Sequence, residues 1–191
     1  MSTSNTAANV SVGKPKIAGA VYCAPKGSTL PTDATTALDA AFKALGYVSE
    51  DGVTNTNSPE TETIKAWGGD VVLTTLTGKA DQFKLTLIES LNTDVLKAVY
   101  GSSNVSGSTA AGLSVRANST MPAASAWVIE MILTGNIAKR IVIPEAQIAE
   151  IGDIVYKDSE AIGYELTLNA LPCADLNGGD THIEYIKAPS T

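Results

Sequence analysis

The chain has 191 residues, 44% of them hydrophobic, which predicts one folded domain with a core of ordinary size. Charged residues make up only 17% and the net charge is −7. This acidic balance argues against a protein that binds nucleic acid or anionic membranes, because phosphate recognition requires clustered Lys and Arg. The sequence shows no membrane-spanning apolar run and no signal-peptide pattern, so we expect a protein made and assembled in the cytoplasm.

The N-terminal residues are polar and have little to bury. We therefore expect residues 1–13 to form a flexible arm and residues 14–191 to form a single β domain. The first strand is predicted over residues 17–24 and ends where Pro25 interrupts it.

A short helix is predicted next, over residues 34–45. Leu38, Phe42 and Leu45 fall at the i, i+4, i+7 spacing of one helical face, and Gly46 is placed to end the last turn.

A long polar segment, residues 49–62, follows and contains almost no residue that could be buried. We expect a long loop here, because its residues are mostly turn and loop formers. Both ends are flanked by apolar residues, and a structured domain seldom keeps so long a loop without a function. After it the chain returns to an apolar pattern around Trp67 and turns at Gly68–Gly69.

A hairpin is predicted from the residues after this turn. Residues 71–77 are expected to form a strand, and Gly78 a tight connection to the next one. Phe83, Leu85 and Leu87 then alternate with polar residues, which indicates a strand with one buried face.

The clearest helix signal begins at Asn92, which is suited to be an N-cap. Leu91 and Leu96 have the spacing of a hydrophobic staple across that cap, and Gly101 is expected to end the helix. Its buried face is expected to comprise Val95, Leu96 and Val99.

The second half is predicted to be rich in strands. Residues 101–112 are too small and polar for a core and are expected to form a loop. Farther along the chain, Pro144 is expected to end a strand. The strands are predicted at residues 113–116, 127–134, 137–143, 148–156, 164–170 and 182–186.

These elements predict a mainly β fold, a β-sandwich or partly open barrel of hairpins with one or two short peripheral α-helices. Trp67 and Trp127 both lie in apolar strand patterns and are expected in the core. The strand at 128–134 is apolar on both faces, so we expect a second copy of the chain to pair with it or cover it.

Residues with catalytic or metal-binding chemistry are few, and we predict no catalytic, cofactor or metal site and no enzyme. His182 is the only histidine and is expected on the surface at a strand edge. The segment Asp175–Asp180 is similar to a calcium loop but lacks its spacing and bidentate Glu, so we expect a turn. Cys23 and Cys173 have no metal-ligand spacing and are expected to be reduced and buried.

Three strings of this sequence carry a family resemblance: GYVSEDGVT, IKAWGGDVV and LIESLNTDVLKAVYG. They resemble the major tail tube protein of long-tailed, non-contractile bacteriophages. The resemblance implies a tail-tube-like β fold, and hexameric rings of this chain that stack into a hollow tube within the virion. It also implies that phage DNA passes through the tube without specific binding, with a tape-measure protein and tail-end proteins as further partners.

The resemblance further implies that the long polar loop orders against the next ring. The predicted inter-ring assembly residues are Asp51, Gly52, Val53, Thr54, Asn55, Thr56, Asn57, Ser58, Pro59 and Glu60.

Two other interpretations stay open at this point. The chain could be the tube protein of a contractile injection system or a type VI-like secretion system, which would share the ring. It could also be a non-enzymatic β-sandwich binding module, although such modules cluster exposed Trp and Tyr.

Overall fold

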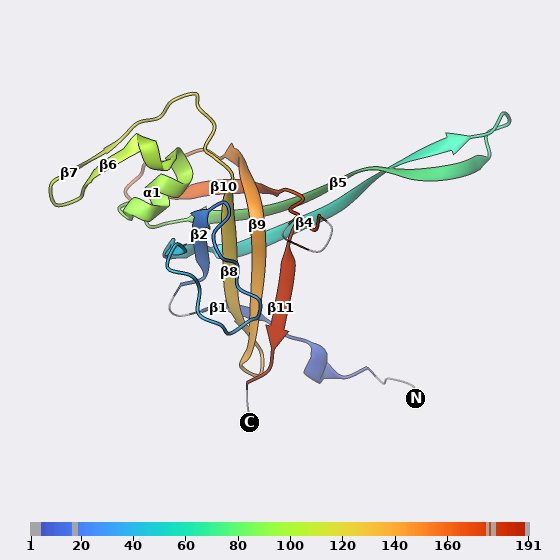
Figure 1. Ribbon diagram of the computed structural model, residues 1–191, viewed down its shortest axis with the longest axis horizontal. Coiled ribbons are helices and arrows are strands. Elements are labelled where there is room, and N and C mark those ends of the chain that lie inside the picture. The colour runs from blue at the N-terminus through green and yellow to red at the C-terminus, as the bar shows by residue number, and fades with distance from the viewer. Residues whose placement is uncertain (1–4, 17–18, 175, 177–178, 190–191) are drawn as a thin grey trace.

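The structure is a computed structural model that describes residues 5–16, 19–174, 176 and 179–189. It contains one large bent sheet, a small two-stranded sheet and, among the described residues, one α-helix (Figure 1). The prediction of a mainly β sandwich-like fold is confirmed, with 49% strand, 8% helix and no closed barrel. The strands are β1 (Gly13–Pro15), β2 (Val21–Pro25), β3 (Lys43–Ala44), β4 (Val48–Lys65), β5 (Val71–Leu87), β6 (Val105–Ser108), β7 (Gly112–Val115), β8 (Ser125–Leu133), β9 (Ile137–Ile151), β10 (Tyr164–Ala170) and β11 (Ile183–Lys187).

The large sheet has nine strands in the order β3-β2-β8-β9-β10-β5-β4, with β1 added to β8 and β11 added to β9. Every strand pair in it is antiparallel. The long strand β9 connects its two halves: residues 137–143 pair with β8, and residues 146–151 pair with β10. The sheet can therefore bend along β9 and enclose a core on one face.

The helix α1 (Thr93–Tyr100) covers this core, as predicted. The Asn92 side chain accepts a hydrogen bond from the Asp94 amide at 3.0 Å, and Gly101 ends the helix with φ 89°. Its predicted buried face is confirmed, but the hydrophobic staple is wrong, because Leu91 is 74% exposed.

The helix predicted over residues 34–45 is wrong, and that segment is instead a chain of turns followed by β3. Phe42 and Leu38 pack in a small cluster on the outer face of the sheet, whereas Leu45 belongs to the main core on the inner face. A single helical stripe cannot reach both faces. The Leu45 amide donates to the Val21 carbonyl at 2.9 Å, which carries the chain past the sheet edge.

The same outer cluster corrects the expectation that a second copy covers the strand at 128–134. In β8, Trp127 and Ile129 face the main core, while Ala126 and Val128 face the outer cluster. The chain's own segment, through Phe42, covers this second face. Since β8 also lies between two other strands, it is not an edge.

Two predicted strand ends are also wrong. Gly78 makes no turn, because β5 runs unbroken through it. Pro144 does not end β9, because it lies at a bulge where two residues of β9 oppose one residue of β8. Proline is tolerated there because a bulged residue needs no ladder hydrogen bond.

Other predicted boundaries differ by a few residues. The first strand is found at Val21–Pro25, and residues 17–18 lie outside the described residues. The segment predicted as a loop over 101–112 contains a short 3-10 turn and β6, which pairs with β7 as a small hairpin. The strand predicted over 148–156 ends at Ile151 as part of β9.

A buried ion pair joins the two central strands. Arg140 of β9 and Glu130 of β8 stand opposite each other and are 1% and 2% exposed. The Arg140 Nε donates to Glu130 Oε1 at 2.9 Å, and its Nη1 donates to the Asp33 carbonyl at 2.6 Å. The Lys16 Nζ forms an ion pair with the other carboxylate oxygen of Glu130, Oε2, at 2.8 Å. This network ties β1 and the segment around Asp33 to the centre of the sheet.

The two cysteines are both free thiols. Cys173 is buried as predicted, whereas Cys23, also expected to be buried, is half-buried. Cys23 packs against the main core, and burial raises its pKa to about 11.

At pH 8 we therefore expect about 0.1% of native Cys23 to be thiolate, so alkylation should be slow. Unfolding in urea should accelerate its alkylation about a hundredfold, because an ordinary thiol is substantially ionised at this pH. Peptide mapping by mass spectrometry after timed iodoacetamide treatment measures this. Equal rates in native and unfolded chain would contradict the packing of Cys23 against the core and its raised pKa.

Candidate functional site

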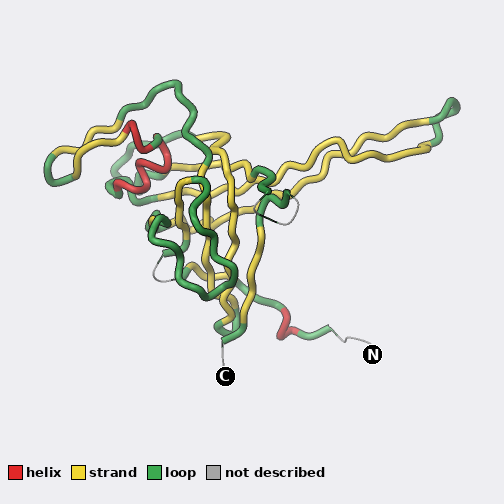
Figure 2. Tube along the Cα trace, in the orientation of Figure 1, coloured by secondary structure: helices red, strands yellow, loops and turns green. Residues whose placement is uncertain are grey.

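A long β-hairpin, formed by β4 and β5, projects far from the rest of the molecule (Figures 1 and 2). We call residues 54–84 the arm. Residues 81–84 and their partners form its base, where Phe83 still belongs to the main core, and the rest projects. The strands of the arm pair from Thr54 opposite Lys84 to Lys65 opposite Val71, with register shifts after Glu60 and after Ile64. The prediction of a long loop over residues 49–62 is thus wrong: these residues form a strand.

The tip of the arm is the turn predicted at Gly68–Gly69. Both glycines have positive φ, 119° and 100°, a conformation that other residues rarely adopt. The Ala66 amide donates to the Asp70 carbonyl at 2.8 Å, and this bond closes the hairpin. Along the strands, threonine is frequent, and its branched side chain favours extended backbone.

The distal arm exposes large apolar side chains. Trp67, expected in the core, is instead 107% exposed at the tip. Monomeric proteins seldom present so many apolar side chains on an isolated ribbon, and such surfaces commonly mark interaction sites. The exposed apolar residues of the arm are Ile64, Trp67, Val71, Val72, Leu73 and Leu76.

The ten predicted assembly residues, 51–60, all lie on β4. Asp51 and Gly52 are within a bulge between Val48 and Val53, and residues 54–60 pair with residues 78–84 of β5. Nine of the ten are exposed, and Val53 is half-buried. Sequence reasoning placed the segment correctly as a surface feature and predicted a strand over residues 71–77. It did not predict that this strand pairs with residues 54–65 as a projecting hairpin, or that Trp67 at the tip is exposed.

The base of the arm is held by a polar network around Asp81, whose side chain is fully buried. Asn55 Nδ2 donates to Asp81 Oδ1 at 2.9 Å. The hydroxyl of Thr181 and the Nδ1 of His182, the latter at 2.6 Å, both donate to Asp81 Oδ2. Beside this carboxylate, Gln82 Nε2 donates to Asn169 of β10 at 2.8 Å.

The pKa of Asp81 is lower than that of an ordinary aspartate. Burial by itself raises it, but the hydrogen bonds from Thr181, Asn55 and His182 outweigh that effect. The carboxylate therefore stays ionised at neutral pH and can accept from all three donors.

His182 was predicted to be an exposed residue at a strand edge, and this is wrong in part. It precedes β11 but is largely buried, with its ring edge-on to Phe83 at 5.2 Å between centroids. Within the described part of the chain, no group of three His, Cys, Asp or Glu side chains is arranged to hold a metal ion. Half of the predicted turn at Asp175–Asp180, residues 175, 177 and 178, lies outside the described residues.

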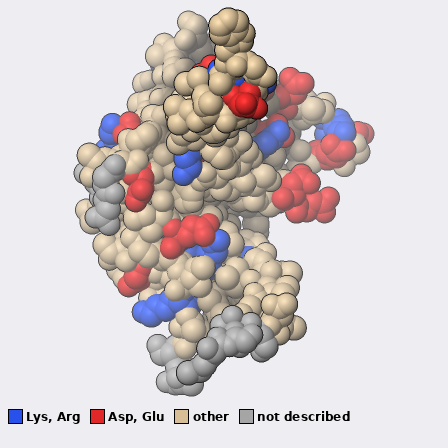
Figure 3. All heavy atoms as spheres, turned by 90° about the vertical axis from the view of Figure 1, so that its right-hand side faces the viewer, with Lys and Arg blue, Asp and Glu red and all other residues tan. Residues whose placement is uncertain are grey.

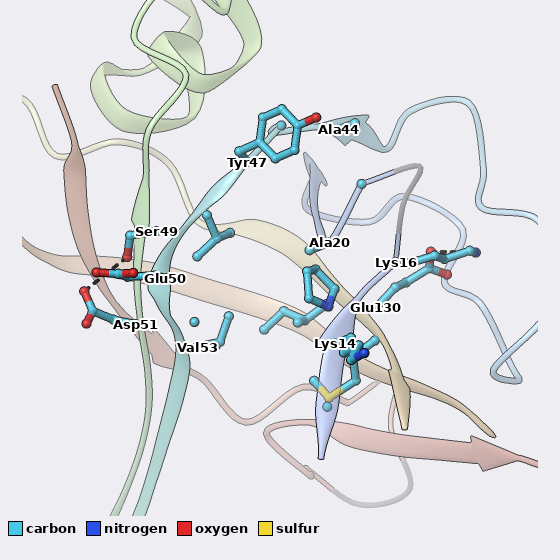
Figure 4. A pocket seen from close by; sticks show the side chains of 18 of the residues that line it. Lys14, Lys16, Ala20, Ala44, Tyr47, Ser49, Glu50, Asp51, Val53 and Glu130 are labelled. Carbon is cyan, nitrogen blue, oxygen red and sulfur yellow. Dashed lines mark hydrogen bonds and ion pairs between the residues drawn. The ribbon is translucent and has the colours of Figure 1, made fainter. Parts of the chain in front are cut away.

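A hollow of about 990 Å³ lies where the two ends of the large sheet approach each other (Figure 4). Lys14 and Lys16 line one side, and Glu50 and Asp51, on the bulge of β4, line the other. Neither β1 nor β3 pairs with β4 across this gap, so the sheet stays open.

Charge is mixed on the face from which the arm projects: acidic and basic side chains are interspersed over it (Figure 3). No helix among the described residues has the length and apolar character needed to cross a membrane.

A family model described as phage tail tube protein matches residues 8–184. The chain belongs to this tail tube family. The match spans both the arm and the sandwich, and so extends well beyond the three strings that carry the resemblance. No curated individual protein matched the sequence.

Membership of the tail tube family makes this chain a structural component of a bacteriophage virion. A tail tube is built from copies of such a chain, so the surfaces that matter are those that meet other copies. The projecting arm and the unpaired sheet edges are the features of this tail tube protein best suited to such contacts.

Proposed function

We propose that this tail tube protein forms hexameric rings that stack into a hollow tube, through which phage DNA passes during genome delivery. The observation that supports this most directly is the arm. A projecting apolar ribbon can insert into a different surface of a neighbouring copy, which makes a contact between two different surfaces. Contacts of this kind generate rings when they close and filaments when they do not.

The open sheet gives a second line of support. Single chains of this size close about eight strands at most, and the interior of such a barrel is filled by side chains. A channel wide enough for duplex DNA therefore requires strands from several chains. The large sheet here is open, and its edge strands β3 and β4 have a neighbour on one side only among the described strands.

The arm would make the contact between successive rings, through the predicted residues Asp51 to Glu60 and through the distal strand residues that the structure adds. A second contact is proposed for the N-terminal residues 1–13. Residues 5–12 are exposed throughout, and the Val12 amide donates to the Thr134 hydroxyl at 3.1 Å. Their flexibility stays a prediction, and residues 1–4 lie outside the described residues.

The acidic balance suits a DNA channel. At a net charge of −7 per chain, a ring of six has a formal net charge of −42. A channel lined by acidic or neutral side chains repels phosphate or leaves it unbound, so DNA would slide along it without binding. A tape-measure protein inside the tube and tail-end proteins at its ends are the further proposed partners, with assembly in the host cytoplasm and no enzymatic role.

To test the role of the arm, residues 60–78 are replaced by Asn-Gly, which suits a tight hairpin turn. The body and the Asp81 network remain, so we expect a folded chain whose free energy of unfolding changes by less than about 1 kcal/mol. Electron microscopy at high protein concentration should show stacked six-membered rings for the natural chain and no tubes for the variant. Tubes formed by the shortened chain would contradict the proposal.

A matched pair of substitutions controls for the loss of apolar surface. Trp67→Ala removes an exposed apolar side chain from the arm tip, and Leu91→Ala removes one from the loop before α1. Only the first is expected to impair tube formation.

A further inference from the structure

Asp81 lies at the point where the arm leaves the body. On β5, Leu87, Leu85 and Phe83 point into the main core, and Asp81 occupies the next inward position of the same alternation. Between Asp81 and the tip, no further residue of β5 is buried. The last inward position of the strand is thus an ionised carboxylate where the pattern calls for an apolar side chain.

A buried carboxylate is costly unless hydrogen bonds replace its hydration. The hydrogen bonds to Asp81 come from two different parts of the chain that meet at the arm base. Asn55 belongs to β4, whereas Thr181 and His182 immediately precede β11. Since β11 pairs with β9 and not with the arm, the carboxylate links the arm to the other half of the sheet.

Beyond this point, the arm has no other strand to hold it. The ladder between β5 and β10 ends at the pair of Gln82 and Asn169, and farther out the described strands β4 and β5 pair only with each other. Isolated two-stranded ribbons are flexible and marginally stable. The direction of the arm is therefore decided at its base.

A small change at the base is amplified at the tip. The ten residue steps from Asp81 to Val71 span about 33 Å at the usual rise of a strand. A swing of about 10° at Asp81 then displaces the tip by about 6 Å, more than the width of one strand. A contact between copies that depends on Trp67 and its apolar neighbours requires tighter control than this.

We propose that Asp81 is the positioning residue of the arm: by binding Asn55, Thr181 and His182 together, it fixes the direction in which the arm projects. Its effect on assembly rests on the proposed function of the arm. Its effect on the mobility of the arm does not, so the two are tested separately.

The first test is hydrogen exchange of the full-length chain, kept below the concentration at which it polymerises. Asp81→Asn retains the shape of the side chain but removes the charge that accepts three hydrogen bonds. We expect amides in residues 79–84 and 181–187 to exchange at least tenfold faster, while those of β8 and β9 are unchanged. Unchanged exchange at the arm base, or equal acceleration throughout the molecule, would overturn the proposal.

The control is Lys84→Ala. Lys84 lies on the same strand, three residues away, and its 2.9 Å ion pair with Glu165 is exposed. Its loss should not accelerate exchange at the arm base. If Asp81→Asn does not fold, Thr181→Val removes one donor with little change in volume, and a smaller acceleration confined to the same two segments is expected. No acceleration in that variant would count against the proposal equally.

The second test is the rate of tube formation. Folded Asp81→Asn should polymerise at least tenfold more slowly than the natural chain and the Lys84→Ala variant. Suppose that the shortened-arm variant fails to form tubes, and that Asp81→Asn exchanges faster at the arm base yet polymerises at the natural rate. That result would refute the role of Asp81 in assembly. If the shortened-arm variant does form tubes, the proposed function of the arm is wrong, and the exchange experiment still decides whether Asp81 fixes the arm.

Discussion

Replacing Trp127 with alanine is expected to lower the free energy of unfolding by about 3–5 kcal/mol. Trp127 is completely buried at the centre of the main core, on the central strand β8. The substitution removes the largest side chain of that core, and the antiparallel ladders on both sides of β8 prevent the backbone from collapsing into the cavity. The indole Nε1 also donates to the Ser125 hydroxyl at 2.9 Å, and that bond is lost.

Urea unfolding followed by circular dichroism measures this loss, and the chain offers a matched control. Trp67→Ala makes the same chemical change at the fully exposed arm tip, where the expected effect on stability is within about 0.5 kcal/mol. Similar losses for the two variants would mean that the core is not organised around Trp127 as the structure shows.

Elements fixed by neighbouring residues could be predicted from the sequence. The helix α1 follows from its cap at Asn92 and its end at Gly101, both local in the chain. The hairpin of β8 and β9 follows from the turn at Gly135–Asn136, where both residues have positive φ. Strand β10 follows from its strict alternation, which the burial of Tyr164, Leu166, Leu168 and Ala170 confirms.

The arm could not be predicted in the same way, because burial does not define its strands. Residues 54–60 are exposed on both faces, so no hydrophobic period of two marks them. Their extended conformation depends on pairing with residues 78–84, and the proline at position 59 argued further for a loop. Composition alone identifies such a segment as surface but not as a strand.

The network at the base of the arm depends on contacts that are distant in sequence. His182 and Asp81 are 101 positions apart, and no motif joins them. One signal was present: Asp81 continues the inward alternation of Phe83, Leu85 and Leu87. A charged residue at a core position indicates a buried partner, although the sequence does not say which one.

The pair of Glu130 and Arg140 gives the second large effect. Glu130→Ala is expected to lower the free energy of unfolding by about 3–5 kcal/mol, because it leaves the Arg140 guanidinium buried without a counter-charge. The Lys16 side chain is 42% exposed, so its ammonium group can extend into solvent when Glu130 is removed. Arg140 cannot, since it is held between the sheet and the carbonyl of Asp33.

The loss of stability in Glu130→Ala comes from the unpaired Arg140 charge, and a double substitution can demonstrate this. Glu130→Leu combined with Arg140→Met replaces the pair by apolar side chains, and such replacements of buried pairs are often neutral or stabilising. We therefore expect the double variant to be more stable than Glu130→Ala, with losses that do not add. Glu165→Ala, which breaks the exposed pair with Lys84, is the control and should cost less than about 1 kcal/mol. Additive losses in the double variant would show that the carboxylate and the guanidinium contribute independently, contrary to the buried bond between them.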